Sequence, residues 1–436
     1  MFFGYSLQDA FLGLYIIAIP FHRAVWKLPF VGEKIQPAEL FLGILACYAL
    51  VRILSGRVKP WFSPLDIPAL LWLAANVVSN AIAGFDGHLL LETAKVIAVV
   101  LVYFIFRLLL SDDFLEKISD VFMLSALVAS LLALLGSVLS ALGTQTALAE
   151  LMQTYPYIGR IGRAMAFTST PNMLGSFLMT ALLLKSAHWC ERKAAKRGEI
   201  IVLAICLLAF AAAITKTVLC FLLGLIALWL LAGKRRTPLA KAMAASAALL
   251  LSAAYLVGSH FIFVPALTPR VLDNMQQGHV TRAVHELGPL LVVETSYLTI
   301  KRSCLHTLKE HFPWGVGTRN FKRQVPRLKE LGIYNRETMA FDPHCTPLGT
   351  LTELGLLGGI ALALLFAQVG RSLLAVWQKR DRPFRHIGAG LIAIFIALSL
   401  EGWVTDIMNF RHYWLLLGVL AYMTRQAARH GASAAA

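Results

Sequence analysis

The sequence PLGTLTELGLLGGIALALLFAQVGRSLLAV, residues 347–376, decides the expected fold because it is almost continuously apolar. A helix that crosses the hydrocarbon core of a bilayer needs about 20 mostly apolar residues, and this stretch is longer. It follows directly on Pro343-His344-Cys345-Thr346, so a histidine stands where a polar loop enters an apolar helix. The stretch therefore predicts a membrane-spanning helix with an ionisable ring at its start.

Segments of the same kind recur along the whole chain. Its 436 residues are 58% hydrophobic and only 15% charged, with a mean hydropathy of +0.68. So few charges do not cover the surface of a soluble protein of this length. We predict an all-α, polytopic integral membrane protein with twelve transmembrane helices, at residues 5–20, 37–54, 66–84, 89–110, 119–142, 171–188, 200–215, 217–233, 242–262, 347–376, 386–405 and 411–426.

The formal net charge of +16 is distributed in a way that favours a membrane over a nucleic acid as the partner. Basic residues gather after the second, sixth, eighth, tenth and twelfth segments, within residues 52–59, 192–197, 234–241, 379–385 and 425–429. Positively charged loops stay on the cytoplasmic side of a membrane. This pattern predicts that both termini are cytoplasmic, that the alternate loops face outward, and that no nucleic acid is bound.

The longest polar region, residues 263–346, lies between the ninth and tenth segments and faces outward in this topology. It holds eleven Lys or Arg and seven Asp or Glu, a basic excess on the side where positive loops are not expected. Residues 294–311 and 321–331 show the apolar spacing of helices. We predict three parts: membrane helices over 1–262, a helical outer loop over 263–346, and three membrane helices with a cytoplasmic tail over 347–436.

His344 is the first candidate for chemistry. Thr346 is a good N-cap and Pro347 a good first residue of the following helix, so the positive end of the helix dipole should lie near the imidazole. That field favours a neutral ring, which accepts a proton from a hydroxyl nucleophile. The alternative is a loop histidine that only makes a hydrogen bond near the membrane surface.

Arg163 is the second candidate, since it precedes a similar helix start at Thr170-Pro171. The free N–H groups of a helix N-terminus bind anions, and a guanidinium above them holds phosphate oxygens in pairs. The alternative for Arg163, favoured for Arg160, is an arginine that extends to the membrane surface.

Further charged residues lie in and beside the outer loop. Arg302 stands on its first helix, and Arg319, Lys322 and Arg323 follow as a basic rim that would attract phosphorylated lipid head groups. Docking on anionic lipid is the alternative for this rim. Glu353 lies about two turns into the tenth segment, where an ionisable residue usually faces a cavity; the alternative is a pair with an outer arginine.

The six cysteines indicate no metal site, because they form no zinc-type pair, and no helical His-Glu-x-x-His is present. Cys304 and Cys345 both fall on the outer side, where an oxidising compartment would allow a disulfide. We predict no metal and no cofactor.

Three of these patterns resemble the superfamily of bacterial O-antigen ligases and O-antigen polymerases. They are Arg163 to Asn172, then Arg302 to Phe321 with its Gly315-Val316-Gly317 turn, and then Pro343-His344 running into Leu348, Leu351, Glu353, Gly355 and Gly358. Twelve spans and a large late periplasmic loop also agree with the ligases. Cys345 stands where the family often has Asn, and Ala166 where a glycine is common.

The resemblance implies transfer of O-antigen glycan from undecaprenyl pyrophosphate to lipid A–core oligosaccharide, at the periplasmic face of the bacterial inner membrane. His344 would be the general base, and Arg163 and Arg302 would stabilise the leaving pyrophosphate without a metal. The anomeric centre would be inverted. Arg160, Arg319, Lys322, Arg323 and Glu353 would bind substrate.

Three alternatives stay open. An O-antigen polymerase and a protein O-oligosaccharyltransferase share the superfamily and its chemistry, and the basic outer loop favours the ligase because its acceptor is rich in phosphate. A lipid-linked glycan flippase or transporter would use the charges inside the membrane instead, and should show repeated halves with interrupted helices. Membrane lipids are expected partners, and the oligomeric state is left open.

Overall fold

Each of the twelve predicted apolar segments forms a helix in the computed structural model. The structure describes residues 6–23, 26–27, 34–151, 162–192, 196–232, 237–265, 280–336, 338–378 and 384–433. The helices are α1 (Leu7–Ala18), α2 (Pro37–Leu54), α3 (Asp66–Ile82), α4 (Gly87–Leu109), α5 (Asp112–Ala141), α6 (Pro171–Arg192), α7 (Arg197–Ala212), α8 (Thr217–Ala232), α9 (Pro238–His260), α13 (Thr346–Gln378), α14 (Arg385–Glu401) and α15 (Arg411–Ser433).

Several of these helices have the dimensions of membrane spans. In the described part of the chain α2, α4, α5, α9 and α13 are long and apolar enough to cross a bilayer. The helices α1, α3 and α8 are apolar but shorter. The chain is therefore a mostly helical membrane protein, and the number of twelve spans stays a prediction.

Polar side chains at the helix starts explain where several helices begin. The side chain of Asp86 accepts a hydrogen bond from the backbone N–H of Leu89 at the start of α4, and Ser111 does the same for Phe114 at the start of α5. Pro37 and Pro238 are the first residues of α2 and α9. Such caps satisfy N–H groups that have no partner within the helix.

The outer loop contains a β-sheet, so the prediction of an entirely helical loop is wrong. Strands β5 (Phe261–Pro265), β6 (Val280–Leu287) and β7 (Leu290–Thr295) form an antiparallel sheet in the order β5-β7-β6. The sheet begins at Phe261, inside the predicted ninth span, because the apolar run of α9 continues without a break into a strand rich in aromatic and β-branched residues. Helices α11 (Ser296–His311) and α12 (Phe321–Glu330) follow.

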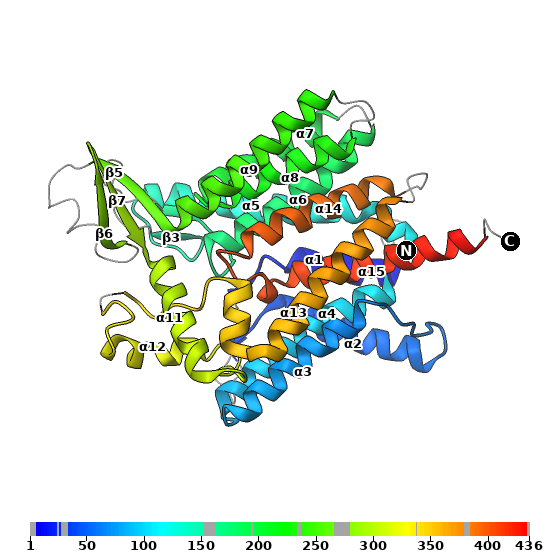
Figure 1. Ribbon diagram of the computed structural model, residues 1–436. Helices are drawn as coiled ribbons and strands as arrows, with labels where there is room; N and C mark the ends of the chain where they lie inside the picture. Colours follow the sequence, from blue (N-terminus) through cyan, green and yellow to red (C-terminus); the bar gives the residue numbers. More distant parts are fainter. Residues whose placement is uncertain are drawn as a thin grey trace.

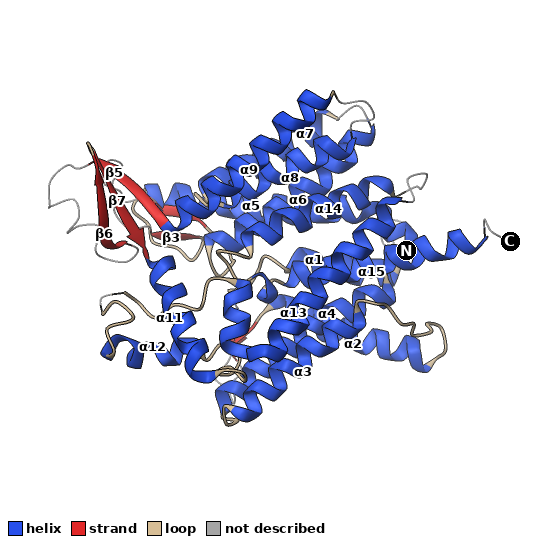
Figure 2. Ribbon diagram, in the orientation of Figure 1, coloured by secondary structure: helices blue, strands red, loops and turns tan. Residues whose placement is uncertain are grey.

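Helices α11 and α12 share a small core of their own. Its buried members are Ile300, Cys304, Val316, Phe321, Val325, Leu328 and Tyr334. Because these side chains turn the apolar face of α12 inward, its Lys and Arg residues face outward. Figures 1 and 2 show the sheet, α11 and α12 at one end of the bundle, which we call the sheet end, with both chain termini at the opposite end.

Two short hairpins and one short helix complete the fold. Strands β1 (Trp26–Lys27) and β2 (Lys34–Ile35) pair, as do β3 (Ala149–Leu151) and β4 (Gly162–Ala164). The 3-10 helix η1 (Ile407–Asn409) precedes α15. Strand β4 packs on α5 and α7, and this contact holds Arg163 at the sheet end.

Helix α13 is broken at Gly355, where φ is 64° and ψ is −157°. Residues 313–317 enter the break and replace the lost helical hydrogen bonds. Val316 and Gly317 donate to the carbonyl oxygens of Thr352 and Glu353 at 3.1 and 2.9 Å, and Leu356 donates to Pro313 at 2.7 Å. Backbone groups freed inside a membrane protein need such partners. The break therefore fixes the outer loop to the helix that follows His344.

Candidate functional site

His344 lies where the outer loop meets α13. Its backbone φ is 46°, in the left-handed region, and its ring is half-buried. The ring centroid lies 5.6 Å from that of Tyr297 and 5.5 Å from that of Phe341. The imidazole thus stands between an aromatic residue of α11 and one of its own loop.

The start of α13 is held differently from the prediction. Thr346 is the first residue of the helix and not its N-cap. Its hydroxyl donates to the carbonyl oxygen of Thr405 at 3.0 Å and accepts from the N–H of Ile407 at 3.0 Å. The predicted capping role of Thr346 is therefore wrong, because the segment before α15 takes this hydroxyl.

Arg163 sits on β4 beside the start of α6. Its Nε donates to the carbonyl oxygen of Ala213 at 3.0 Å, and its Nη2 donates to Oδ1 of Asn172 at 3.0 Å. Pro171 is the first residue of α6, and the Thr170 hydroxyl accepts from Met173 at 3.3 Å. The predicted helix start beside Arg163 is confirmed.

Tyr297 connects Arg163 to His344. Burial raises the pKa of Tyr297, while the guanidinium of Arg163 and a hydrogen bond with Asn172 lower it. The same aromatic ring faces His344. Two of the three predicted catalytic residues therefore approach one tyrosine from different parts of the chain.

Lys216 adds a positive charge that the sequence analysis missed. Its Nζ lies 6.0 Å from the ring centroid of Tyr297 and donates to the carbonyl oxygen of Gly258. Desolvation first, and then the guanidinium of Arg163, lower the pKa of Lys216 to about 8, although the residue as a whole is largely exposed. Lys216 is thus mostly protonated near pH 7, about one pH unit below the midpoint of its titration.

Lys301 is a second missed cation, one helical turn after Tyr297 on α11. Its Nζ lies 2.6 Å from Nε2 of His260. Nδ1 of His260 lies 2.6 Å from the carbonyl oxygen of Leu256, which can only accept a hydrogen bond. Nδ1 is therefore protonated and donates to this oxygen, and Nε2 accepts a hydrogen bond from Lys301. Desolvation lowers the pKa of Lys301. A four-residue spacing from Tyr297 was the signal that places Lys301 on this face.

Arg302 points to a different partner. Its Nη1 and Nη2 donate to the two carboxylate oxygens of Glu294 at 3.0 and 2.9 Å, and its side chain is 58% exposed. This bidentate pair ties α11 to β7. In this conformation Arg302 can reach a substrate phosphate only after releasing Glu294.

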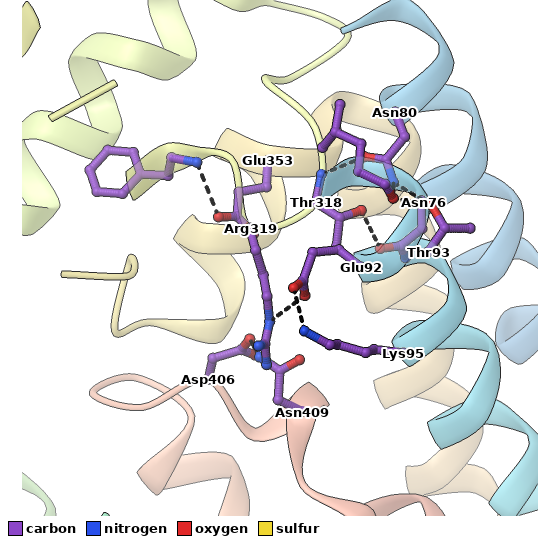
Figure 3. A network of polar contacts seen from close by, with 12 residues as sticks. Asn76, Asn80, Glu92, Thr93, Lys95, Thr318, Arg319, Glu353, Asp406 and Asn409 are labelled. Carbon is purple, nitrogen blue, oxygen red and sulfur yellow. Dashed lines mark hydrogen bonds and ion pairs between the residues drawn. The ribbon is translucent and has the colours of Figure 1, made fainter. Parts of the chain in front are cut away.

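Arg319 does not stand on the outer rim with its neighbours. Its side chain extends inward, and its Nε lies 3.4 Å from Oε2 of Glu92 on α4. Figure 3 shows its guanidinium beside Asp406 and Asn409. Burial raises the pKa of the Asp406 carboxyl, and Arg319 opposes this shift.

Glu353 faces the same inner region. The backbone N–H of Phe321 donates to its Oε1 at 3.4 Å, and Arg319 also approaches its carboxyl. Glu353 also lines a cleft together with Arg319. Arg319 and Glu353 therefore belong to one polar network inside the bundle (Figure 3).

The remaining candidates are peripheral. Lys322 is exposed on α12, and Nη1 of Arg323 lies 2.6 Å from Oδ2 of Asp86 at the start of α4. Arg160 lies outside the described residues. Cys304 and Cys345 are both buried and carry free thiols, so the structure contains no disulfide between them.

No model of a known protein family matches the chain, and no curated protein matches it either. Functional conclusions therefore rest on the geometry of the site and on its motifs.

Proposed function

We propose that the protein is a glycosyltransferase that moves O-antigen glycan from undecaprenyl pyrophosphate to a hydroxyl of lipid A–core oligosaccharide. The observation that carries the proposal is the meeting of Arg163 and His344 at Tyr297. An anion-binding side chain and a proton acceptor from distant segments are the two groups that this transfer needs. The motif resemblance supplies the substrate class.

In the proposed reaction the acceptor hydroxyl oxygen attacks the anomeric carbon of the donor. The bond from that carbon to the pyrophosphate oxygen breaks, and the hydroxyl proton passes to His344. Attack opposite the leaving group inverts the anomeric centre. Undecaprenyl pyrophosphate leaves with the negative charge, and no step uses a metal.

Arg163 and Lys216 are the proposed partners of the leaving pyrophosphate. Both act on Tyr297, and Arg163 also stands beside the first turn of α6, where backbone N–H groups favour an anion. Arg302 is proposed as a third partner of the pyrophosphate, which it would bind after its ion pair with Glu294 breaks. The sheet end would face the periplasm from the inner membrane.

A flippase or transporter is the second proposal, and the break in α13 is the observation that favours it. Transporters place ligands at interrupted helices. Here residues 313–317 fill the interruption with backbone hydrogen bonds, which is a structural role. We therefore prefer the transferase, and the experiment below separates the two because a transporter forms no glycosidic bond.

The test supplies purified protein in detergent with lipid-linked O-antigen and lipid A–core. The ligase proposal expects a ligated product that requires both substrates. Longer glycans on undecaprenyl pyrophosphate without the acceptor would identify a polymerase, and transfer to a Ser- or Thr-containing peptide would identify a protein O-oligosaccharyltransferase. No product under any of these conditions would contradict the proposal.

A further inference from the structure

A cleft of about 490 Å³, counted with its open mouth, lies between α3, α4, α13 and the segment before α15. Its lining includes Trp72, Arg319, Glu353, Asp406 and Asn409. Figure 3 shows the Arg319 guanidinium beside Asp406 and Asn409, while the Glu353 carboxyl accepts from the backbone N–H of Phe321. Pro343 and Cys345 line the cleft as well, so it borders the two neighbours of the proposed base.

The charges around this cleft disfavour a phosphate. Arg319 and Lys95 supply two positive charges, whereas Glu92, Glu353 and Asp406 supply three carboxyl groups. Both cations already pair with Glu92, so a pyrophosphate in this partly buried site would find little uncompensated positive charge. The predicted role of Arg319 in attracting phosphate therefore does not fit its surroundings.

Glu92 lies outside the lining of the cleft but pairs with its lining residue Arg319. Oε1 of Glu92 accepts from Nζ of Lys95 at 2.8 Å. Oε2 is buried, lies 3.4 Å from Nε of Arg319, and has no hydrogen-bond partner among the described residues. The negative charge of Glu92 therefore holds the guanidinium of Arg319 in place at the cleft.

A neutral sugar satisfies these conditions. Its hydroxyl groups both donate and accept, which suits the carboxyl groups together with the donors of Arg319 and Asn409. Trp72 offers an apolar surface in the same lining, as is usual in small-molecule sites. Sugar hydroxyls also add no charge to a cleft that already holds an excess of carboxyl groups.

We infer that this cleft binds an uncharged sugar of the acceptor, with Asp406, Asn409 and Arg319 as its hydrogen-bonding groups. The inference rests on the proposed function, because it places the acceptor beside His344. The donor pyrophosphate then binds separately, near Arg163 and Lys216. The two substrates approach the base from separate regions.

The test measures binding of two probes to the full-length protein in detergent by titration calorimetry. One probe is core oligosaccharide freed of lipid A and dephosphorylated, and the other is undecaprenyl pyrophosphate. Asp406→Asn and Asn409→Ala remove sugar partners, and Val99→Trp fills the cleft without changing its charge. Arg327→Ala is the matched control, since Arg327 lies on the exposed face of α12 and pairs with Glu310 of α11.

We expect each cleft variant to weaken oligosaccharide binding by about tenfold, which corresponds to about 1.4 kcal/mol, and to leave undecaprenyl pyrophosphate binding within about twofold. In the transfer assay the KM for acceptor should rise more than kcat falls. Unchanged oligosaccharide affinity in Val99→Trp, or an equal loss for both probes, would overturn the inference. Binding that requires the core phosphates would also overturn it.

The binding readout separates this inference from the proposed function. Oligosaccharide binding that depends on Asp406, in a protein that forms no product, would support the sugar site and contradict the transferase. Product formation by cleft variants that bind both probes normally would support the transferase and contradict the sugar site. Asn409→Ala and Val99→Trp keep the Asp406 carboxyl. If Asp406→Asn fails to fold, these two variants still test the cleft.

Discussion

At the scale of single residues, backbone strain gathers around the candidate site. In the described part of the chain the non-glycine residues with positive φ are Ala166, Ile214, Arg319 and His344. Each one is, or lies within three residues of, a charged or ionisable side chain discussed above. Such conformations cost about 1 kcal/mol or more and persist where the surroundings hold them. This distribution supports a functional role for the sheet end.

Ala166 allows the strain to be measured. Its φ is 51°, so Ala166→Gly should relieve strain of about 1 kcal/mol or more, which offsets the loss of its buried methyl group and leaves the free energy of unfolding nearly unchanged. Thermal unfolding in detergent measures the change. Ala164→Gly on β4 is the control and should destabilise by about 1 kcal/mol or more, because it adds backbone freedom and also removes a buried methyl group. Equal effects of the two changes would exclude strain at Ala166.

Lys216 should make donor binding depend on pH. Its pKa is lowered to about 8, so the ammonium loses its proton as the pH rises from 7 to 9. If only the charged form binds, affinity for undecaprenyl pyrophosphate falls by about tenfold over this range. Lys216→Arg keeps its charge and should give a flat profile. A profile that falls equally in Lys216→Arg would assign the pH dependence to another group.

The sequence indicated only part of this site. His344 and Arg163 were found because each precedes a helix start that proline and threonine mark. Lys301 and Arg302 are adjacent, and only packing decides that Lys301 faces His260 while Arg302 pairs with Glu294. Lys216 lies in a short helix connection, whose position beside Tyr297 depends on contacts distant in sequence.

At the scale of elements, the break in α13 is the feature that hydropathy does not reveal. Residues 347–376 read as one apolar helix, and Gly358, Gly359 and Gly370 lie in the same helix without breaking it. Gly355 differs because residues 313–317 approach its backbone. A Cβ on Gly355 would lie 2.0 Å from the carbonyl oxygen of Pro313. The sheet was missed for a related reason, since its first strand continues an apolar helix.

Substitutions at the break should destabilise the protein strongly. A Cβ on Gly315 would lie 2.4 Å from the carbonyl oxygen of Glu353, and both Gly315 and Gly355 have positive φ. Gly315→Ala and Gly355→Ala should each lower the free energy of unfolding by about 3 kcal/mol or more. Gly370→Ala, with open space around it, should instead stabilise by up to about 1 kcal/mol. Similar unfolding temperatures for all three would argue against the break.

At the scale of the whole molecule, the sequence predicted the helices well and their neighbours poorly. Apolar length located all twelve helices, but which pairs touch depends on local fits between surfaces. Gly418 of α15 illustrates this, since its Cβ would lie 2.9 Å from the carbonyl oxygen of Tyr103 on α4. Small residues allow helices in membranes to approach closely. The packing of α13 on α3, and of α14 on α6 and α8, likewise depends on how well the surfaces of the helices fit together.

The predicted topology places the two ends of the bundle on opposite sides of the inner membrane. With the exposed native thiols removed by Cys47→Ser and Cys190→Ser, Lys322→Cys should react with a membrane-impermeant maleimide in intact spheroplasts. Arg57→Cys, after α2, should react only after the membrane is opened. Equal labelling of both positions in intact spheroplasts would refute an odd number of spans between them.

The central claim is that His344 takes the proton of the attacking hydroxyl. The most direct measurement compares the rate of product formation by the parent protein and by His344→Ala, with both substrates saturating. We predict a fall of about 100-fold or more, since a general base contributes that much, with undecaprenyl pyrophosphate binding unchanged. Equal rates in the two proteins would contradict the claim.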